Sequence, residues 1–231
     1  MDCDNMLTMR TRTLLAVIVL SGLIPGNAQT PNPPEVAPGI SLPTGGDGTV
    51  YILDTPASGP VLLHIQPHEV VTASHAVTNF LRAQVYSGPH SSTEVDGPHA
   101  PIALSSAKAV LYVRLSGEEA EIMRTRVHLL WLQPGKKRRE VSDFSRNIFG
   151  GQRTRNVDEV PCDLEMIDGT NWLKITPNDP LLPGEFAVAF LPKDVNQYPG
   201  VVYDFSVPGS KPSSSNPYDS KPPANSEPPK P

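Results

Sequence analysis

Basic residues are concentrated in one part of this sequence, and they could bind an anionic partner. Residues 124–155 contain nine basic and two acidic residues, whereas the rest of the core (residues 45–207) contains five basic and seventeen acidic residues. A positive stretch of this kind attracts phosphorylated lipids, acidic glycans or acidic protein surfaces. The candidate ligands of such a partner are Arg124, Arg126, Lys136, Lys137, Arg138 and Arg139.

The same charges also have a simpler interpretation, which is that they are solvated. Pro134 and Gly135 begin a turn, which places residues 136–139 near a hairpin tip, where basic residues usually face water. They could also blunt an exposed sheet edge, or pair across strands with the acidic residues that follow. Those acidic residues are Asp158, Glu159, Asp163 and Glu165. The basic run lacks the interleaved aromatic residues of single-stranded nucleic-acid sites, and the net charge of −5 argues against a general nucleic-acid binder.

Histidine and cysteine are the other residues that could bind a metal or attack a substrate. A proline lies between His64 and His68, so they cannot share a regular helix face, and on a strand they would lie about 13 Å apart. His90 and His99 each follow a proline in a predicted loop. Acidic neighbours disfavour the thiolate of Cys162, which we interpret as a small buried residue on a strand. We predict no metal site and no cofactor.

A catalytic site is not visible in the sequence. It contains no G-x-S-x-G elbow, no HExxH and no CxxC motif. A hydrolase remains an alternative, because a Ser/His/carboxylate site is assembled in space, and a deep pocket that collects these three residue types would favour it. Another alternative is an envelope assembly subunit that pairs through an edge strand. We predict a non-enzymatic module that binds an anionic envelope component or another envelope protein.

Short strands must position these residues, because proline supplies 27 of the 231 residues and interrupts helices. Between residues 123 and 133, apolar residues alternate with Arg124, Arg126 and His128, which predicts a half-buried strand. Residues 70–81 fit either a helix or a strand. Strands are expected at residues 49–54, 60–66, 82–87, 100–104, 109–115, 123–133, 138–144, 161–167, 171–176, 185–191 and 201–207. Many short strands at close spacing predict a sandwich or a barrel.

The first 28 residues are typical of a secretory signal peptide. Arg10 and Arg12 precede an apolar core at residues 14–24, and small residues then lead to a cleavage position that would make Gln29 the first mature residue. No later segment is apolar over the length that a transmembrane helix needs. We therefore expect an exported protein, periplasmic or extracellular, with no transmembrane segment after cleavage.

Proline also divides the mature chain into segments. Residues 29–44 read as a Pro-rich linker, residues 45–207 as one domain, and residues 208–231 as a Pro/Ser-rich tail. The tail has too few apolar residues to offset the entropy of ordering it, so we predict that it is disordered.

Several segments carry a resemblance to a known family. They read VYILD at 50–54, VPCDLE at 160–165, NWLKITP at 171–177, PLLPGEFA at 180–187 and VYDFSV at 202–207. Together they resemble a family of uncharacterised, exported β-sandwich domains of bacteria, and the Leu-x-Pro-Gly-Glu-aromatic pattern also occurs in immunoglobulin-like domains. The resemblance implies export and fold, and no catalytic residues. We predict an all-β protein, an antiparallel, immunoglobulin-like β-sandwich with disordered Pro-rich ends.

Overall fold

The computed structural model describes residues 33–44, 46–74, 91–116, 120–145, 153–209 and 216–218. Its strands form three sheets in which all neighbours pair antiparallel, so the predicted all-β class is confirmed. The described part contains one short helix, α2 (Ala120–Arg124). Within these residues, no helix has both the length and the apolar character needed to cross a membrane.

The largest sheet closes on itself as a six-stranded barrel. Its strands in spatial order are β9 (Arg138–Ser145), β6 (Ser91–Asp96), β5 (His68–Ser74), β14 (Val201–Val207), β13 (Gly184–Phe190) and β8 (Val127–Pro134). The ring is complete because β8 pairs with β9, placing Gln133 opposite Glu140. Strand β10 (Thr154–Asn156) pairs with β9 outside the ring. Since one sheet is closed, the predicted immunoglobulin-like sandwich is not confirmed.

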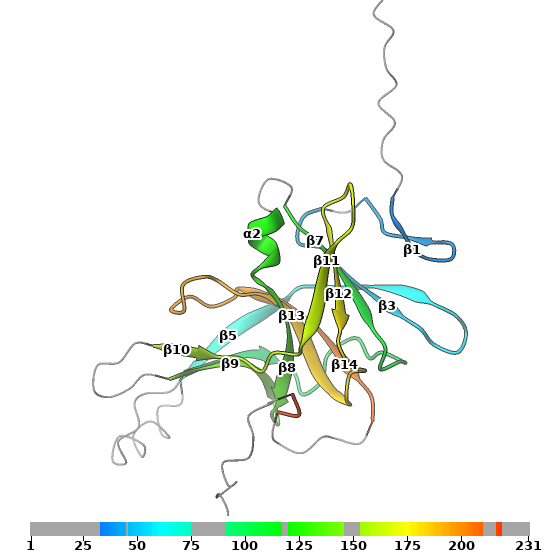
Figure 1. The fold of residues 1–231 in the computed structure, drawn as a ribbon. Helices are drawn as coiled ribbons and strands as arrows, with labels where there is room; N and C mark the ends of the chain where they lie inside the picture. Colours follow the sequence, from blue (N-terminus) through cyan, green and yellow to red (C-terminus); the bar gives the residue numbers. More distant parts are fainter. Residues whose placement is uncertain are drawn as a thin grey trace, which may run out of the picture. The chain divides into compact units, whose positions relative to one another are not determined.

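A second sheet of five strands packs against the barrel. Its strands in order are β11 (Cys162–Met166), β12 (Trp172–Pro177), β7 (Val110–Arg114), β3 (Val50–Asp54) and β4 (Val61–Ile65). The β3–β4 hairpin turns where residues 55–59 predicted a turn, and β11 and β12 pair across the predicted Asp168–Gly169 turn. In Figure 1, β9 and β10 lie at one side of the molecule and β3 at the other, with β13 between them.

Two hydrophobic cores explain why β8 is buried on both faces. Leu129 and Trp131 belong to the core between the barrel and the five-stranded sheet. Leu130 and Leu132 belong to a second core, which the barrel strands build on their inward faces. The prediction of one polar face on this strand is wrong, because closure of the barrel buries that face as well. The strand also begins at Val127 rather than at residue 123, since helix α2 comes before it.

The N-terminal segment contributes to a third core. Residues predicted as part of a linker form a hairpin of β1 (Glu35–Ala37) and β2 (Ile40–Ser41). Leu42, which follows it, is fully buried with Tyr112 and Trp172 of the five-stranded sheet. Ordered structure therefore begins earlier in the chain than residue 45.

Other expectations differ from the structure in local ways. Residues 100–104, expected as a strand, make a single bridge between Ala103 and Ser206, and strand β6 was not expected. Within the predicted disordered tail, Tyr218 packs against the first core and its hydroxyl accepts a hydrogen bond from the Leu182 amide at 3.0 Å. The predicted signal peptide and the strand expected at residues 82–87 lie outside the described residues. The helix-or-strand segment at 70–81 is a strand as far as Ser74, where the described part stops.

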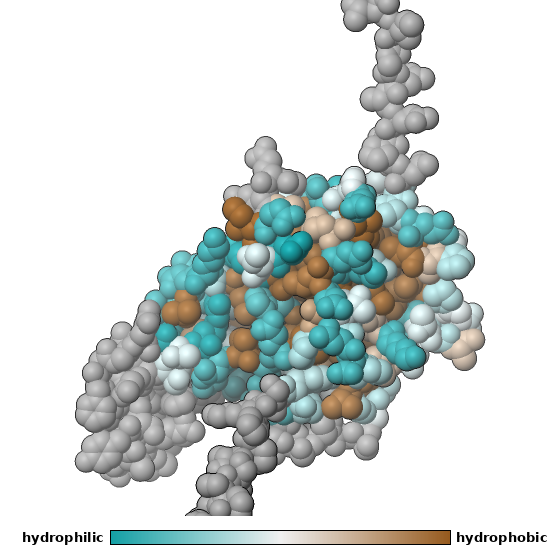
Figure 2. Space-filling view, viewed as in Figure 1, coloured by the Kyte–Doolittle hydropathy of each residue, from teal (hydrophilic) through white to brown (hydrophobic). Residues whose placement is uncertain are grey.

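Polar and apolar residues are interleaved on the face seen in Figure 2, where hydrophilic side chains cover much of the two sheets and apolar ones show between them. Isolated apolar residues on a surface are ordinary. The search for a site therefore turns to charges and cavities.

Candidate functional site

The basic residues predicted to bind an anionic partner do not form one continuous patch. Arg124 ends helix α2 and pairs with Glu121 at 3.8 Å, and Nε of Arg126 donates to the carbonyl oxygen of Leu191 at 3.0 Å. Both precede β8, whereas residues 136–139 follow it. An eight-residue strand separates the two groups, which is about 26 Å at roughly 3.3 Å per residue.

The tip of the β8–β9 hairpin is basic, as predicted, but not all of its basic side chains are available to bind a partner. Lys136 and Lys137 are exposed. Arg138 is paired with Asp96 at 2.7 Å and with Glu94 at 3.6 Å. The hydrogen bond to Asp96 and the charge of that carboxylate raise the pKa of the Arg138 guanidinium. The partners of Arg138 are therefore on β6, and not among the acidic residues that follow in sequence.

Arg139 lies inside the barrel, which corrects its assignment as a surface ligand. It is fully buried, with Nη1 2.7 Å from Oδ2 of Asp204 and 3.4 Å from Oε2 of Glu185. Its Nε and Nη2 donate to the carbonyl oxygens of Gly97 and Asp96 at 3.0 and 3.1 Å. A buried charge persists only where it is paired and hydrogen-bonded, and Arg139 meets both conditions.

Two histidines extend this cluster toward solvent. Nδ1 of His68 is 3.4 Å from Oδ1 of Asp204, and Nδ1 of His99 is 2.9 Å from Oε1 of Glu185. The His99 side chain is 75% exposed and that of His68 is 31% exposed, whereas the two carboxylates are almost fully buried. We call these five residues, with Arg139 at the centre, the Arg139 network.

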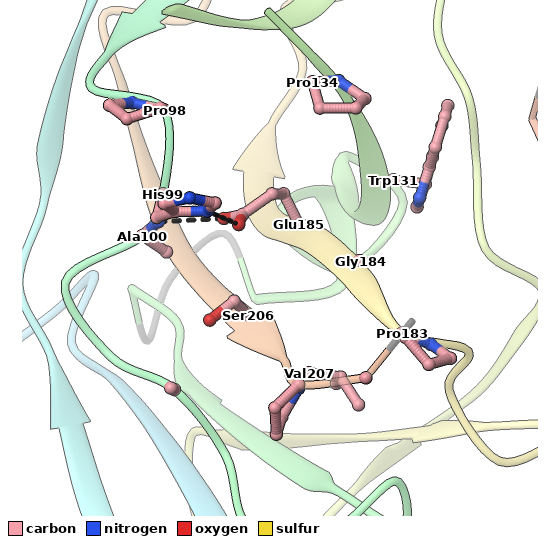
Figure 3. A pocket seen from close by; sticks show the side chains of 13 residues that line it. Pro98, His99, Ala100, Trp131, Pro134, Pro183, Gly184, Glu185, Ser206 and Val207 are labelled. Carbon is pink, nitrogen blue, oxygen red and sulfur yellow. Dashed lines mark hydrogen bonds and ion pairs between the residues drawn. The ribbon is translucent and has the colours of Figure 1, made fainter. Parts of the chain in front are cut away.

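A pocket of about 420 Å³ opens beside Glu185 at one end of the barrel. Its size is within the range of small-molecule sites. Most of its wall is apolar and includes Pro98, Pro134, Pro183, Pro208, Ala103, Val207 and Trp131. Its polar side chains are those of His99, Glu185 and Ser206. Figure 3 shows the paired His99 and Glu185 on one side and Trp131 across from them. We call this cavity the rim pocket.

Trp131 brings an unused hydrogen-bond donor to the wall of the rim pocket. The residue is 1% exposed, and its Nε1 has no hydrogen-bond partner among the residues that the structure describes. A buried donor without a partner costs about 1–3 kcal/mol. A Cβ atom on Gly184 would lie 2.8 Å from this Nε1, so only glycine at that position leaves room for the indole. This part of the wall thus combines a close contact between Trp131 and Gly184 with the unsatisfied N–H group of the indole.

The loop that forms the opposite wall is held at several points. The amide of Ala100 donates to Oε2 of Glu185 at 2.8 Å, and the amide of Leu104 donates to the carbonyl oxygen of Ser206 at 2.8 Å. Asp54 then accepts hydrogen bonds from the amides of the next two residues at 2.9 and 3.1 Å. The acceptors of these bonds lie on the barrel and on the five-stranded sheet, so the pocket wall is held in place without a ligand.

The rim pocket also contains the three residue types that the hydrolase alternative requires. His99 is hydrogen-bonded to Glu185, as the base and the orienting carboxylate of a triad would be. The Ser206 hydroxyl is 3.4 Å from the carbonyl oxygen of Ile102, and within the described chain it makes no hydrogen bond to His99. Of the two hydrogen bonds that link a triad, the one between the base and the carboxylate is therefore formed, and the one between the serine and the base is not. No cluster of three metal-ligating side chains occurs among the residues that the structure describes.

Cys162 has the environment expected of a packing residue. It begins β11, and its Sγ lies 3.2 Å from the carbonyl oxygen of Val160. Burial, with the nearby charges of Glu159 and Asp163, raises the pKa of the thiol to about 12. The thiol is thus protonated at neutral pH and is a poor nucleophile.

The remaining histidines are dispersed. His64 stacks on Tyr51, with ring centroids 4.8 Å apart, and lies on β4 rather than near the barrel end. His128 pairs with Glu159 at 2.8 Å, which lowers the pKa of that carboxyl. His90 lies outside the described residues. Neither His64 nor His128 lines the rim pocket.

The sequence reasoning did not select the residues that matter most at this site. Asp204 and Glu185 are separated in sequence from Arg139 by 65 and 46 positions, and Trp131 was predicted only as a core residue. One signal was present, because Asp204 is an acidic residue within the otherwise apolar segment at 202–205. A charge at such a position indicates a buried partner elsewhere in the chain.

No protein-family model matches this chain, and neither a curated protein nor a solved structure does. The site is therefore interpreted from its own geometry.

Proposed function

We propose that this protein is an exported, non-enzymatic binding module that holds a small apolar ligand in the rim pocket. The observation that carries the proposal is a preformed cavity of about 420 Å³ with a mainly apolar wall and a few polar side chains. Cavities of this composition are the usual form of ligand sites. Export rests on the signal-like residues 1–28.

The fixed loop and the close packing of the pocket favour binding over a structural role alone. Hydrogen bonds to Glu185 and Asp54 hold one wall, and Trp131 against Gly184 holds the other. An apolar ligand loses water contact there without requiring the protein to rearrange, so little ordering entropy opposes binding.

Binding is tested with a neutral apolar compound such as decanol, titrated calorimetrically into the full chain. We expect saturable binding, and we expect Ala103→Leu to weaken it strongly, because Ala103 is exposed and lines the pocket, so a larger side chain fills the cavity. Ala57→Leu is the matched control, since Ala57 is exposed in the β3–β4 turn. Absence of saturable binding, or equal binding by the Ala103→Leu variant, contradicts the proposal.

A hydrolase is the second candidate, because His99, Glu185 and Ser206 share the pocket. It would use Ser206 as nucleophile, His99 as base and Glu185 to orient the base. The expected result is turnover of a short-chain p-nitrophenyl ester that Ser206→Ala abolishes while the decanol affinity is kept. Turnover that survives Ser206→Ala contradicts this assignment.

A further inference from the structure

The two lysines of the hairpin tip, Lys136 and Lys137, lie next to the rim pocket. Pro134 is part of the pocket wall, and Lys136 and Lys137 follow it after one glycine. The carbonyl oxygen of Lys137 accepts a hydrogen bond from the Gly97 amide at 2.9 Å. The residue after Gly97, Pro98, is again part of the wall. The tip is thus fastened to the loop that borders the cavity.

The tip has a fixed shape. A Cβ atom on Gly135 would overlap the carbonyl oxygen of Arg138, so the turn closes tightly at this glycine. Pro134 and Arg139 pair across the base of the tip. The backbone that carries the two lysines therefore keeps one position relative to the pocket, although their side chains are free to move.

Within the described part of the chain, no ion pair compensates the positive charge of these lysines. Among the described residues, no carboxylate lies within 4.0 Å of the ammonium group of Lys136 or Lys137. The acidic groups nearest to the tip along β6, Asp96 and Glu94, are paired with Arg138. An anion at the pocket entrance would meet two cations that no carboxylate neutralises.

The charge inside the pocket is arranged differently. Glu185 is satisfied by the ring of His99, the amide of Ala100 and the guanidinium of Arg139. An anionic group placed deep in the pocket would lose water without finding a free donor cation. Apolar chains are favoured inside, and an anionic group is favoured at the rim.

From this arrangement we infer that the ligand is an anionic amphiphile of the fatty-acid kind. Its apolar chain lies in the rim pocket against the prolines and Trp131, and its carboxylate lies at Lys136 and Lys137. The inference rests on the proposed function and adds the class of ligand. Of the kinds of anionic partner predicted from the basic run it retains the lipid, here with a carboxylate in place of a phosphate, because neither an acidic glycan nor an acidic protein surface would use an adjoining apolar cavity.

The test compares three ligands with the same chain and different head groups: decanoate, decanol and decylamine. Each is titrated into the full chain by calorimetry, below its micelle concentration and at low salt. We expect decanoate to bind about 3- to 10-fold more tightly than decanol, as two partly exposed ion pairs would provide, and decylamine to bind most weakly. The preference for decanoate should shrink as salt is added, because salt screens exposed charges.

The double variant Lys136→Ser/Lys137→Ser should remove the preference for decanoate and leave the decanol affinity unchanged. The matched control is Lys108→Ser/Lys193→Ser, in which two exposed lysines outside the lining of the rim pocket are replaced; it should keep the preference.

Three results would overturn the inference, and they are distinguishable. Equal affinities for decanoate and decanol reject the anionic ligand and leave the pocket as a binding site. A preference that survives the loss of both lysines rejects their role. Failure of all three ligands to bind rejects the proposed function together with the inference.

Discussion

Replacing Arg139 by methionine should lower the free energy of unfolding by about 3–5 kcal/mol. The substitution keeps much of the side-chain volume but removes the cation that Asp204 and Glu185 share inside the barrel. Both carboxylates are buried, so neither recovers the lost interaction from water. The carbonyl oxygens of Gly97 and Asp96 lose their donors as well. The change is measured by urea-induced unfolding, followed by circular dichroism.

The neighbouring Arg138→Met variant is the control for removing a positive charge from this hairpin. Arg138 is 45% exposed and its closer partner, Asp96, is 65% exposed, so water replaces much of the lost interaction and the variant should be clearly milder than Arg139→Met. Adding Glu185→Gln and Asp204→Asn to Arg139→Met should restore part of the stability, because the unpaired charges are then gone. If Arg139→Met and Arg138→Met were equally mild, the Arg139 network would not stabilise the barrel.

Replacing Asp54 by alanine should cost about 3 kcal/mol, which is the second largest effect that we expect. Its carboxylate is 5% exposed and accepts four hydrogen bonds, at 2.6–3.1 Å, from Thr55, Ser105 and Ser106. Hydrogen bonds to a charged group contribute more than neutral ones, and the alanine variant loses all four of them together with the buried carboxylate that organises the loop. Urea-induced unfolding measures the loss.

Asp54→Ala should also weaken decanol binding, since Ala103 of the pocket wall lies two residues before Ser105, which Asp54 holds. Asp163→Ala is the matched control, because Asp163 is exposed on β11 and its carboxylate makes no hydrogen bond within the described chain. It should change neither stability nor binding by a measurable amount. An Asp54→Ala variant with wild-type stability would show that these loop contacts are dispensable.

The buried position of Arg139 shows why the site was only partly predictable. In the sequence it is the last of four basic residues, and nothing local separates it from Lys136, Lys137 or Arg138. Its burial depends on closure of the barrel, which brings β14 and β13 to face β9 across the interior. A local pattern cannot encode a partner 65 positions away.

The rim pocket was unpredictable for the same reason. Its walls come from the loop at 98–103, from β8 and from the segments at 183–185 and 206–209. Each segment taken alone reads as a turn or as a strand end. The hydrolase alternative did anticipate that histidine, serine and a carboxylate could meet in a pocket, but the residues could not be named in advance.

The amino-acid sequence determined the strand-rich character of this protein and its hairpins, since alternation and turn residues act over a few positions. It placed Gly135 at the base of a basic tip, and the β8–β9 hairpin turns there. Barrel closure, the burial of Arg139 and the pocket beside Lys136 and Lys137 were decided by tertiary structure alone. Those features depend on which strand faces are covered and on which distant charges meet, and these are properties of the packed chain rather than of any one segment.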